Sequence, residues 1–459
     1  MRKGLLAALA IVLGLVIAAP VFSADLSVTG YMGIGYRLYK NLWPEINTAP
    51  DQNVDNWMQR VDLHLHLKTS DALTGKVRFY IDSFPNPWGT AMTGRNAMGT
   101  WGAEQVTVEV KEAYMDFKIP GLNAPTFVRA GVQYFDIRPF VFLTVPGAGI
   151  SLRSTCEVAQ GKFTVGAGWG KMRERDEVAS DGEVGADLFY GVFDYKGKGY
   201  GLGAYIAATA GSRKDATGFE KGNIWWLGLY SDGKVGPVNY QADLIFDTGS
   251  EKMYNAPKYK YSGWLARAVL TYPYEKANFG LGALYVSGDD ANKPNKIKGF
   301  VLPKGAETLG PASDSLIVVS GWGAGPGPMC DVGLTTNPFN FAPKGSGYLA
   351  QEGWGGIWGV RLFADYKALD WLKLAAQVAY WGDTYKNGDT FERALGTKDK
   401  DEKSIGVEVD LGAQVSIYKN LNLYTAFGYL FKGKAVDMKE SGKEIDNPYA
   451  FVVNLIYTF

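Results

Sequence analysis

The sequence predicts an all-β fold: one transmembrane, antiparallel, up-and-down β-barrel with 18 strands. Three observations support this class. Apolar and polar residues alternate with a period of two, short and long connections alternate along the chain, and the last segment keeps its apolar pattern up to Phe459. A period of two is typical of strands, because successive side chains point to opposite faces.

Composition agrees with this class and excludes others. The chain has 459 residues, including 58 glycines, and 14% of its residues are aromatic. After the first two dozen residues it has no apolar stretch of roughly 20 residues, which is the length that a membrane-spanning helix needs. Lys+Arg and Asp+Glu both number 47, so the net charge predicts no nucleic-acid partner.

The N-terminal segment resembles an export signal. Arg2 and Lys3 are basic, residues 5–19 are apolar, and Pro20 breaks the apolar stretch. This pattern predicts a secretory signal peptide over residues 1–23, with cleavage after residue 24 as the alternative. Residues 24–459 are then expected to form a single barrel domain in the Gram-negative outer membrane.

The alternation is clearest in five segments: residues 60–68, 76–82, 239–247, 361–367 and 405–417. In each of them most apolar residues share one parity and most polar residues share the other. A soluble sandwich would bury the apolar set inside. Charged residues recur on the opposite face of most segments, which fits a water-filled lumen better.

The connections fall into two classes of length. Short ones are predicted near residues 69–75, 120–125, 157–161, 196–199, 232–236, 273–277, 369–370 and 419–421. Long polar ones are predicted at residues 39–56, 85–104, 136–148, 173–183, 212–222, 249–260, 288–355, 383–403 and 434–446. Short periplasmic turns and long external loops are typical of outer-membrane barrels. Nine long loops imply 18 strands, and merging the weak pair around Cys156 would leave 16.

One segment changes parity in the middle. Val106, Val108 and Val110 share a face, whereas Met115 and Phe117 have the opposite parity. One extra residue in a strand reverses the parity beyond it. The sequence therefore predicts a β-bulge near Glu112.

The final segment carries a candidate assembly signal. Tyr457 and Phe459 end a run of apolar residues that recur at every second position from Tyr449. This pattern resembles the signal that the outer-membrane assembly machinery reads, so we expect that machinery to be a partner. Other aromatic residues lie toward strand ends, as girdles at the membrane interfaces require: Trp225, Trp264, Tyr272, Tyr285, Trp358 and Tyr380.

Polar residues of inward parity are the candidates for lining a pore. They are Arg60, His64, His66, Lys76, Arg78, Asp82, Arg129, Gln133 and Arg153. Their strands are neighbours, so the basic groups could form a ladder whose field orients dipolar solutes. Alternatively, they pair with Asp62, Asp82 or Asp116, or only solvate a wide lumen.

Two loops are unusual. Residues 137–148 are apolar, and a loop exposed to water has little reason to contain Phe140 and Phe142. We expect this loop either to fold into the barrel, with Arg138, Phe140 and Phe142 at a constriction, or to cover a subunit contact. The loop over residues 288–355 is far longer than a typical connection. It could cap the mouth, pack on a neighbouring subunit or bind a substrate.

Residues 108–117 and 128–133 resemble the matching region of Gram-negative porins, most closely the homotrimeric porins of sulfate-reducing bacteria. The resemblance implies a passive diffusion channel for small polar or charged solutes, a homotrimer, and a third loop that narrows each pore. Outer-membrane lipid and lipopolysaccharide are further expected partners. Residues 137–148 lack the acidic groups usual in such a loop, with only Asp136 at its edge. The arginines therefore predict a preference for anions or zwitterions.

Other functions have weaker support. A barrel hydrolase needs a base beside a nucleophile, and His64 and His66 stand without a recognisable serine or aspartate motif. A barrel that encloses an electron-transfer protein would need a haem-bearing partner. We therefore expect no enzyme, no cofactor and no metal site. Cys156 and Cys330 would either form a disulfide or remain two thiols.

Overall fold

The computed structural model describes residues 24–41, 54–82, 107–139, 141–173, 184–213, 219–253, 257–290, 292–304, 316, 318, 349–352, 356–387, 402–436 and 446–459. The predicted signal peptide, Cys330 and most of the 288–355 loop lie outside these residues. Within them, no helix is long and apolar enough to cross a membrane.

Eighteen long strands form the wall. Their bounds are β1 (Asp25–Lys40), β2 (Val54–Ser70), β3 (Leu73–Asp82), β4 (Thr107–Lys118), β5 (Thr126–Ile137), β6 (Leu143–Val158), β7 (Gly161–Arg173), β8 (Val184–Gly197), β9 (Tyr200–Arg213), β10 (Phe219–Val235), β11 (Val238–Met253), β13 (Trp264–Tyr274), β14 (Ala277–Val286), β18 (Ile357–Leu369), β19 (Leu372–Asp383), β20 (Ser404–Tyr418), β21 (Leu421–Lys432) and β22 (Tyr449–Thr458).

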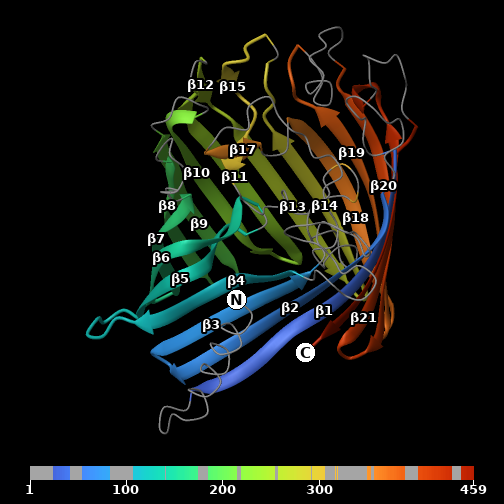
Figure 1. Cartoon of the computed structure of the whole chain (residues 1–459). Coiled ribbons are helices and arrows are strands. Elements are labelled where there is room, and N and C mark those ends of the chain that lie inside the picture. Colours follow the sequence, from blue (N-terminus) through green and yellow to red (C-terminus); the bar gives the residue numbers. More distant parts are fainter. Residues whose placement is uncertain are drawn as a thin grey trace, which may run out of the picture.

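Each wall strand pairs antiparallel with the next, and β22 pairs with β1, so the sheet closes. Figure 1 shows this closure, with the blue first strand beside the red last strands. The predicted barrel of 18 strands is confirmed. The alternative of 16 strands is wrong, because β6 and β7 are separate strands joined by a tight turn. Cys156 lies near that turn on the outer face.

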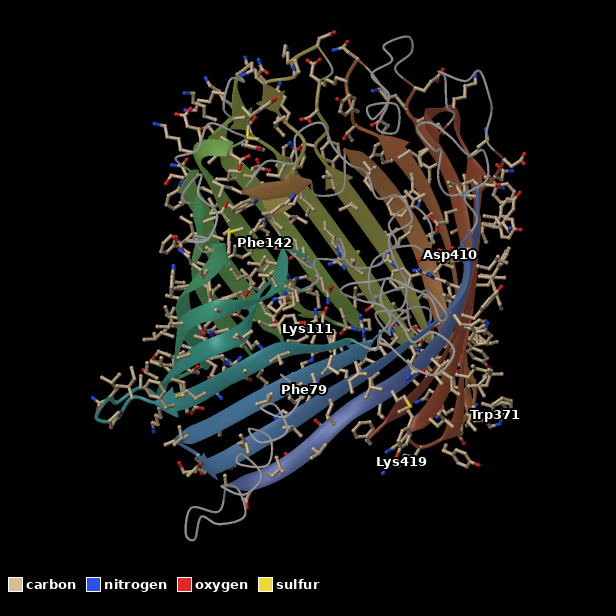
Figure 2. The ribbon with its side chains drawn as sticks, in the orientation of Figure 1. Phe79, Lys111, Phe142, Trp371, Asp410 and Lys419 are labelled. Atoms are coloured by element: carbon tan, nitrogen blue, oxygen red, sulfur yellow. The ribbon has the colours of Figure 1, made fainter. Side chains whose placement is uncertain are left out.

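All eight predicted short connections link consecutive strands at one end of the barrel; seven have two residues, and the one between β4 and β5 has seven. In Figure 2, Trp371 and Lys419 mark two of these turns at the end opposite the long connections. Tight turns suit antiparallel neighbours, whose ends meet within a few residues.

The two faces of the wall follow the predicted parity. Outward positions are apolar and exposed, including Leu227, Leu281, Leu362 and Leu411. Inward positions hold both buried apolar side chains and most of the buried charged ones. An apolar outer band with a polar interior is the pattern of a barrel surrounded by lipid.

The predicted bulge near Glu112 is confirmed. Arg78 pairs with Glu112 and the adjacent Phe79 pairs with Val110, so Lys111 has no register partner on β3. The extra residue lets Val110 face outward and Glu112 face inward within the same strand. The Lys111 side chain projects into the lumen (Figure 2).

The β5–β6 hairpin leaves the wall above this bulge. β4 pairs with β5 only as far as Ala113 and Val132, whereas β5 and β6 stay paired up to Ile137 and Leu143. The predicted loop over residues 137–148 is therefore mostly strand, with a short tip at residues 138–142. This hairpin tip enters the barrel.

Four short strands belong to the external end. β12 (Lys258–Tyr261) pairs with β11 and, in parallel, with β15 (Lys296–Ile297). β16 (Val301–Pro303) and β17 (Ala350–Glu352) form a separate two-stranded sheet. Both ends of the 288–355 loop thus contribute backbone to this part of the molecule.

Candidate pore constriction

The hairpin tip packs on the inner face of the wall. Phe142 is fully buried, and its ring stacks on that of Tyr205 with centroids 4.8 Å apart. Its centroid lies 5.9 Å from that of Trp226. Figure 2 shows Phe142 inside the barrel. Burial of this aromatic side chain against β9 and β10 explains how an apolar loop avoids water.

Arg138, in the same tip, forms ion pairs with the carboxylates of Asp232 and Asp243. Its guanidinium donates to both oxygens of Asp232 at 2.7 Å and to Oδ1 of Asp243 at 2.5 Å. Arg138 has a φ of 48°, and its carbonyl accepts the amides of Val141 and Phe142 at 3.0 Å. A forked guanidinium suits two carboxylates at once, so Arg138 fixes the hairpin to β10 and β11.

The wall beside the hairpin also carries paired charges, and Arg78 there lies 5.1 Å from the centroid of the Tyr134 ring on β5. Arg78 donates to both oxygens of Asp62, at 2.8 and 2.6 Å, and its Nη1 lies 3.6 Å from Glu112. Lys76 Nζ donates to Glu112 at 2.5 Å, and His64 lies 2.8 Å from Asp62. These side chains come from β2, β3 and β4, whose register places the partners side by side.

Arg129 on β5 repeats this arrangement. It donates to both oxygens of Asp116 at 2.8 and 2.7 Å, and its guanidinium lies 3.9 Å from the centroid of the Tyr114 ring. Gln133 donates to the carbonyl of Gly149 at 3.0 Å and accepts from Ser151 at 2.7 Å. Both residues therefore face inward, as their parity predicts.

The remaining predicted residues differ in their surroundings. Arg60 is buried, with its guanidinium 4.5 Å from the Tyr80 ring centroid. His66 lies 3.2 Å from the Thr29 hydroxyl. Arg153 is exposed and has no ion pair within the described part of the chain. The Asp82 side chain and Phe140 lie outside the described residues.

These contacts revise the picture of an unopposed arginine ladder. Arg78 and Arg129 each hold a carboxylate in a two-pronged ion pair, which is the alternative that the sequence left open. Lys111 adds another pair, with its Nζ 3.1 Å from Glu109. Parity identified the inward cations, but it did not show that the acids on neighbouring strands would neutralise them.

Sequence reasoning also missed a set of carboxylates that hold the long loop. Asp247 accepts the amides of Gly263 at 2.8 Å and Val301 at 3.1 Å. Glu251 accepts the amide of Leu349 at 2.5 Å. Both carboxylates are buried on β11. They fix segments from both ends of the 288–355 loop against the inner wall.

A second pair of carboxylates lies on β20. Asp410 accepts the amide of Leu316 at 3.2 Å, and Glu408 accepts the amide of Val318 at 3.2 Å. Both acids are fully buried, and Figure 2 shows Asp410 on the wall far from Phe142. Inward acidic residues two apart were visible in the sequence, but nothing in it showed that a distant loop would supply their donors.

The candidate assembly residues lie where the barrel closes. Phe459 exchanges two backbone hydrogen bonds with Gly30, at 2.9 and 3.0 Å. The rings of Tyr457 and Phe459 lie 5.8 Å apart, and both side chains are exposed on the outer face. These residues thus extend the pairing between the last and first strands.

No protein-family model and no curated protein match the chain. Several solved structures from Pseudomonas aeruginosa do. OccK9 (OpdG) is 12% identical, with a TM-score of 0.53 over 94% of this chain and 99% of that one. OpdK with vanillate is 12% identical, with a TM-score of 0.51 over 95% and 98%. OpdQ is 13% identical, with a TM-score of 0.50 over 95% and 98%. At such identities the likeness establishes a shared barrel fold.

Proposed function

We propose that this protein is an outer-membrane porin through which small polar or zwitterionic solutes diffuse passively. The observation that carries the proposal is the β5–β6 hairpin, which folds into a closed barrel beside a charged wall. A lumen narrowed by one hairpin and lined by charges admits hydrated solutes and disfavours apolar ones. The apolar outer band and exposed aromatic residues support a location in lipid.

Paired charges suit zwitterions in particular. Arg78 with Asp62, and Arg129 with Asp116, offer a cation and an anion within one hydrogen-bond length of each other. A solute that carries both charges can exchange partners with such a pair without leaving a charge unsatisfied. We therefore expect the preference for anions to be weak and the preference for zwitterions to remain, with the exposed Arg153 contributing most to the former.

The matched structures are consistent with this role. OpdK, which shares the fold, is an outer-membrane protein. The finer similarity to porins of sulfate-reducing bacteria, and the homotrimer that it implies, remain part of the proposal. Native mass spectrometry of the detergent-extracted protein tests the trimer: a single-chain mass would contradict it.

Reconstitution into planar bilayers tests the channel itself. The expected result is stepwise, ohmic conductance with a weak ion preference in a KCl gradient. Liposome swelling should be faster with small zwitterionic amino acids than with apolar solutes of similar size. Folded protein that inserts but conducts no ions would overturn the proposal and favour a structural or enzymatic role.

A further inference from the structure

A basic pocket lies on the outer face of the barrel, at the external end. Its volume is about 470 Å³, and it is lined by Thr248, Gly249, Ser250, Lys258, Lys260, Tyr261, Ser262, Lys296 and Lys298. Four of these residues are lysines with exposed side chains. The hydroxyls of Thr248, Ser250 and Ser262 add neutral hydrogen-bond donors.

The strand pairing holds these lysines together. Lys260 lies opposite Ser250 on β11 and opposite Lys296 in the parallel pairing with β15. The Lys260 amide donates to the Asn295 carbonyl at 3.0 Å, and the Lys298 amide donates to Asp289 at 2.5 Å. Like charges directly opposite one another on a sheet repel. An anion in the pocket would relieve that repulsion.

The neighbouring acidic groups do not neutralise the cluster. Glu251 points inward and binds the Leu349 amide, Asp289 binds backbone amides, and Glu220 pairs with Lys252 at 2.5 Å. Asp290 pairs with Lys293. Within the described residues, none of the four pocket lysines has an acidic partner. The whole chain has no net charge, so the positive charge of this pocket comes from the local arrangement of the lysines and not from an excess of basic residues in the protein.

The position of the pocket indicates what occupies it. Thr248 and Ser250 have outward parity, two and four residues beyond the exposed Phe246 on β11. Phe246 pairs with Trp264, whose ring stacks on Tyr285 at 4.5 Å. Outward aromatic rings mark the membrane interface. At about 3.3 Å per residue, the lysines therefore lie at the level of the lipid head groups.

The geometry points to a binding site for the phosphate groups of an outer-leaflet glycolipid, held by Lys258, Lys260, Lys296 and Lys298. Ammonium groups bind phosphate as point charges, and clusters of basic residues beside a membrane bind anionic head groups. The hydroxyls would complete the phosphate contacts. This inference depends on the membrane location but not on the channel, because the pocket is on the outer face.

The test uses the full-length folded protein in neutral detergent. Binding of bisphosphorylated lipid A is measured by native mass spectrometry for the wild type and for Lys260→Gln with Lys296→Gln. Loss of two lysines should weaken binding about 25-fold, since each basic residue near an anionic lipid contributes roughly a fivefold factor. Replacing both lysines by arginine should preserve binding. Lys196→Gln with Lys234→Gln, at the opposite rim, is the matched control.

Three further outcomes would overturn the inference. In the first, the glutamine variant binds lipid A as tightly as the wild type. In the second, the opposite-rim control loses as much affinity for lipid A as the pocket variant does. In the third, the wild type binds dephosphorylated lipid A as tightly as bisphosphorylated lipid A. Complete competition by millimolar inorganic phosphate would assign the pocket to a free anion instead of a lipid. Bilayer conductance of the variant should equal that of the wild type, so a failure of the channel proposal is distinguishable from a failure here.

Discussion

Arg78 and Arg129 lie in the lumen as halves of ion pairs, and their partners decide their effect on a passing solute. Two opposite charges within hydrogen-bond distance produce a strong local field but almost no net charge at longer range. Asp62 and Asp116 therefore matter for permeation as much as the arginines do. The unit that faces the solute is the pair.

A double-mutant cycle on Arg129 and Asp116 tests whether the ion pair, and not either charge alone, sets the ion preference of the pore. Arg129→Gln frees the Asp116 carboxylate and should shift the reversal potential toward cation preference. Asp116→Asn frees the guanidinium and should shift it toward anions. Charges a few ångströms from a permeating ion interact by about 1 kcal/mol in water, so permeability ratios should change several-fold. The double variant should return close to the wild type, and equal shifts of one sign would contradict the pairing.

Phe459 is a second single residue with a testable role, in the assembly of the barrel. Its backbone bonds to Gly30 complete the pairing of β22 with β1, and its ring lies on the outer face. We expect Phe459→Ala to reduce the amount of folded protein in the outer membrane while leaving single-channel conductance unchanged. Quantitative immunoblotting of unboiled outer-membrane fractions measures this. Normal assembly at native expression would show that the signal lies elsewhere.

Sequence parity predicted which way single residues face, but not which partners they find. Arg60, Arg78 and Gln133 all face inward, as alternation requires. Their partners depend on the register between strands, which turns and bulges fix. The partners of Arg138 lie about a hundred residues along the chain, on strands that the hairpin reaches only in the folded barrel.

At the scale of elements, the β5–β6 hairpin has two independent attachments. One is the apolar contact of Phe142 with Tyr205 and Trp226, and the other is the ion-paired Arg138. The apolar character of residues 137–148 predicted burial of this segment. Its destination could not be predicted, because a subunit interface would bury the same side chains.

Removing the ionic attachment should loosen the constriction without unfolding the barrel. Arg138→Gln leaves Asp243 buried and less well paired, which costs on the order of 3 kcal/mol locally. We expect single-channel conductance to rise or to fluctuate between levels. Lys367→Gln, which removes a cation that is paired with Asp370 at a short turn, is the control. Wild-type conductance in Arg138→Gln would show that this hairpin does not set the pore size.

At the scale of the whole molecule, every wall strand has two hydrogen-bonded neighbours, including the first and the last. Closure leaves no continuous edge within the wall, which suits a sheet whose surroundings offer no water. The number of strands could be predicted because nine long loops alternate with eight short connections along the sequence. The 288–355 loop could not be placed, since its anchors are backbone amides, which no side-chain pattern reveals.

A closed barrel predicts a specific behaviour on gels. Unboiled samples should migrate differently from boiled ones, because the folded sheet resists detergent until heated. Far-ultraviolet circular dichroism should show a spectrum dominated by β-structure that is lost in the same temperature range. Identical mobility before and after boiling would contradict a stable closed sheet.

Because of the bulge at Lys111, the deletion of one residue from β4 should have different effects on folding at different positions. Deleting Lys111 would join Val110 to Glu112 with both still on their present faces, so β4 would become a regular strand. Deleting Tyr114 would instead turn one half of β4 over and place Glu112 against lipid, at a cost of up to a few kcal/mol. The Lys111 deletion should yield folded protein and the Tyr114 deletion should not. Length variation among descendants of this gene would then be confined to external loops and to this one position in the strand.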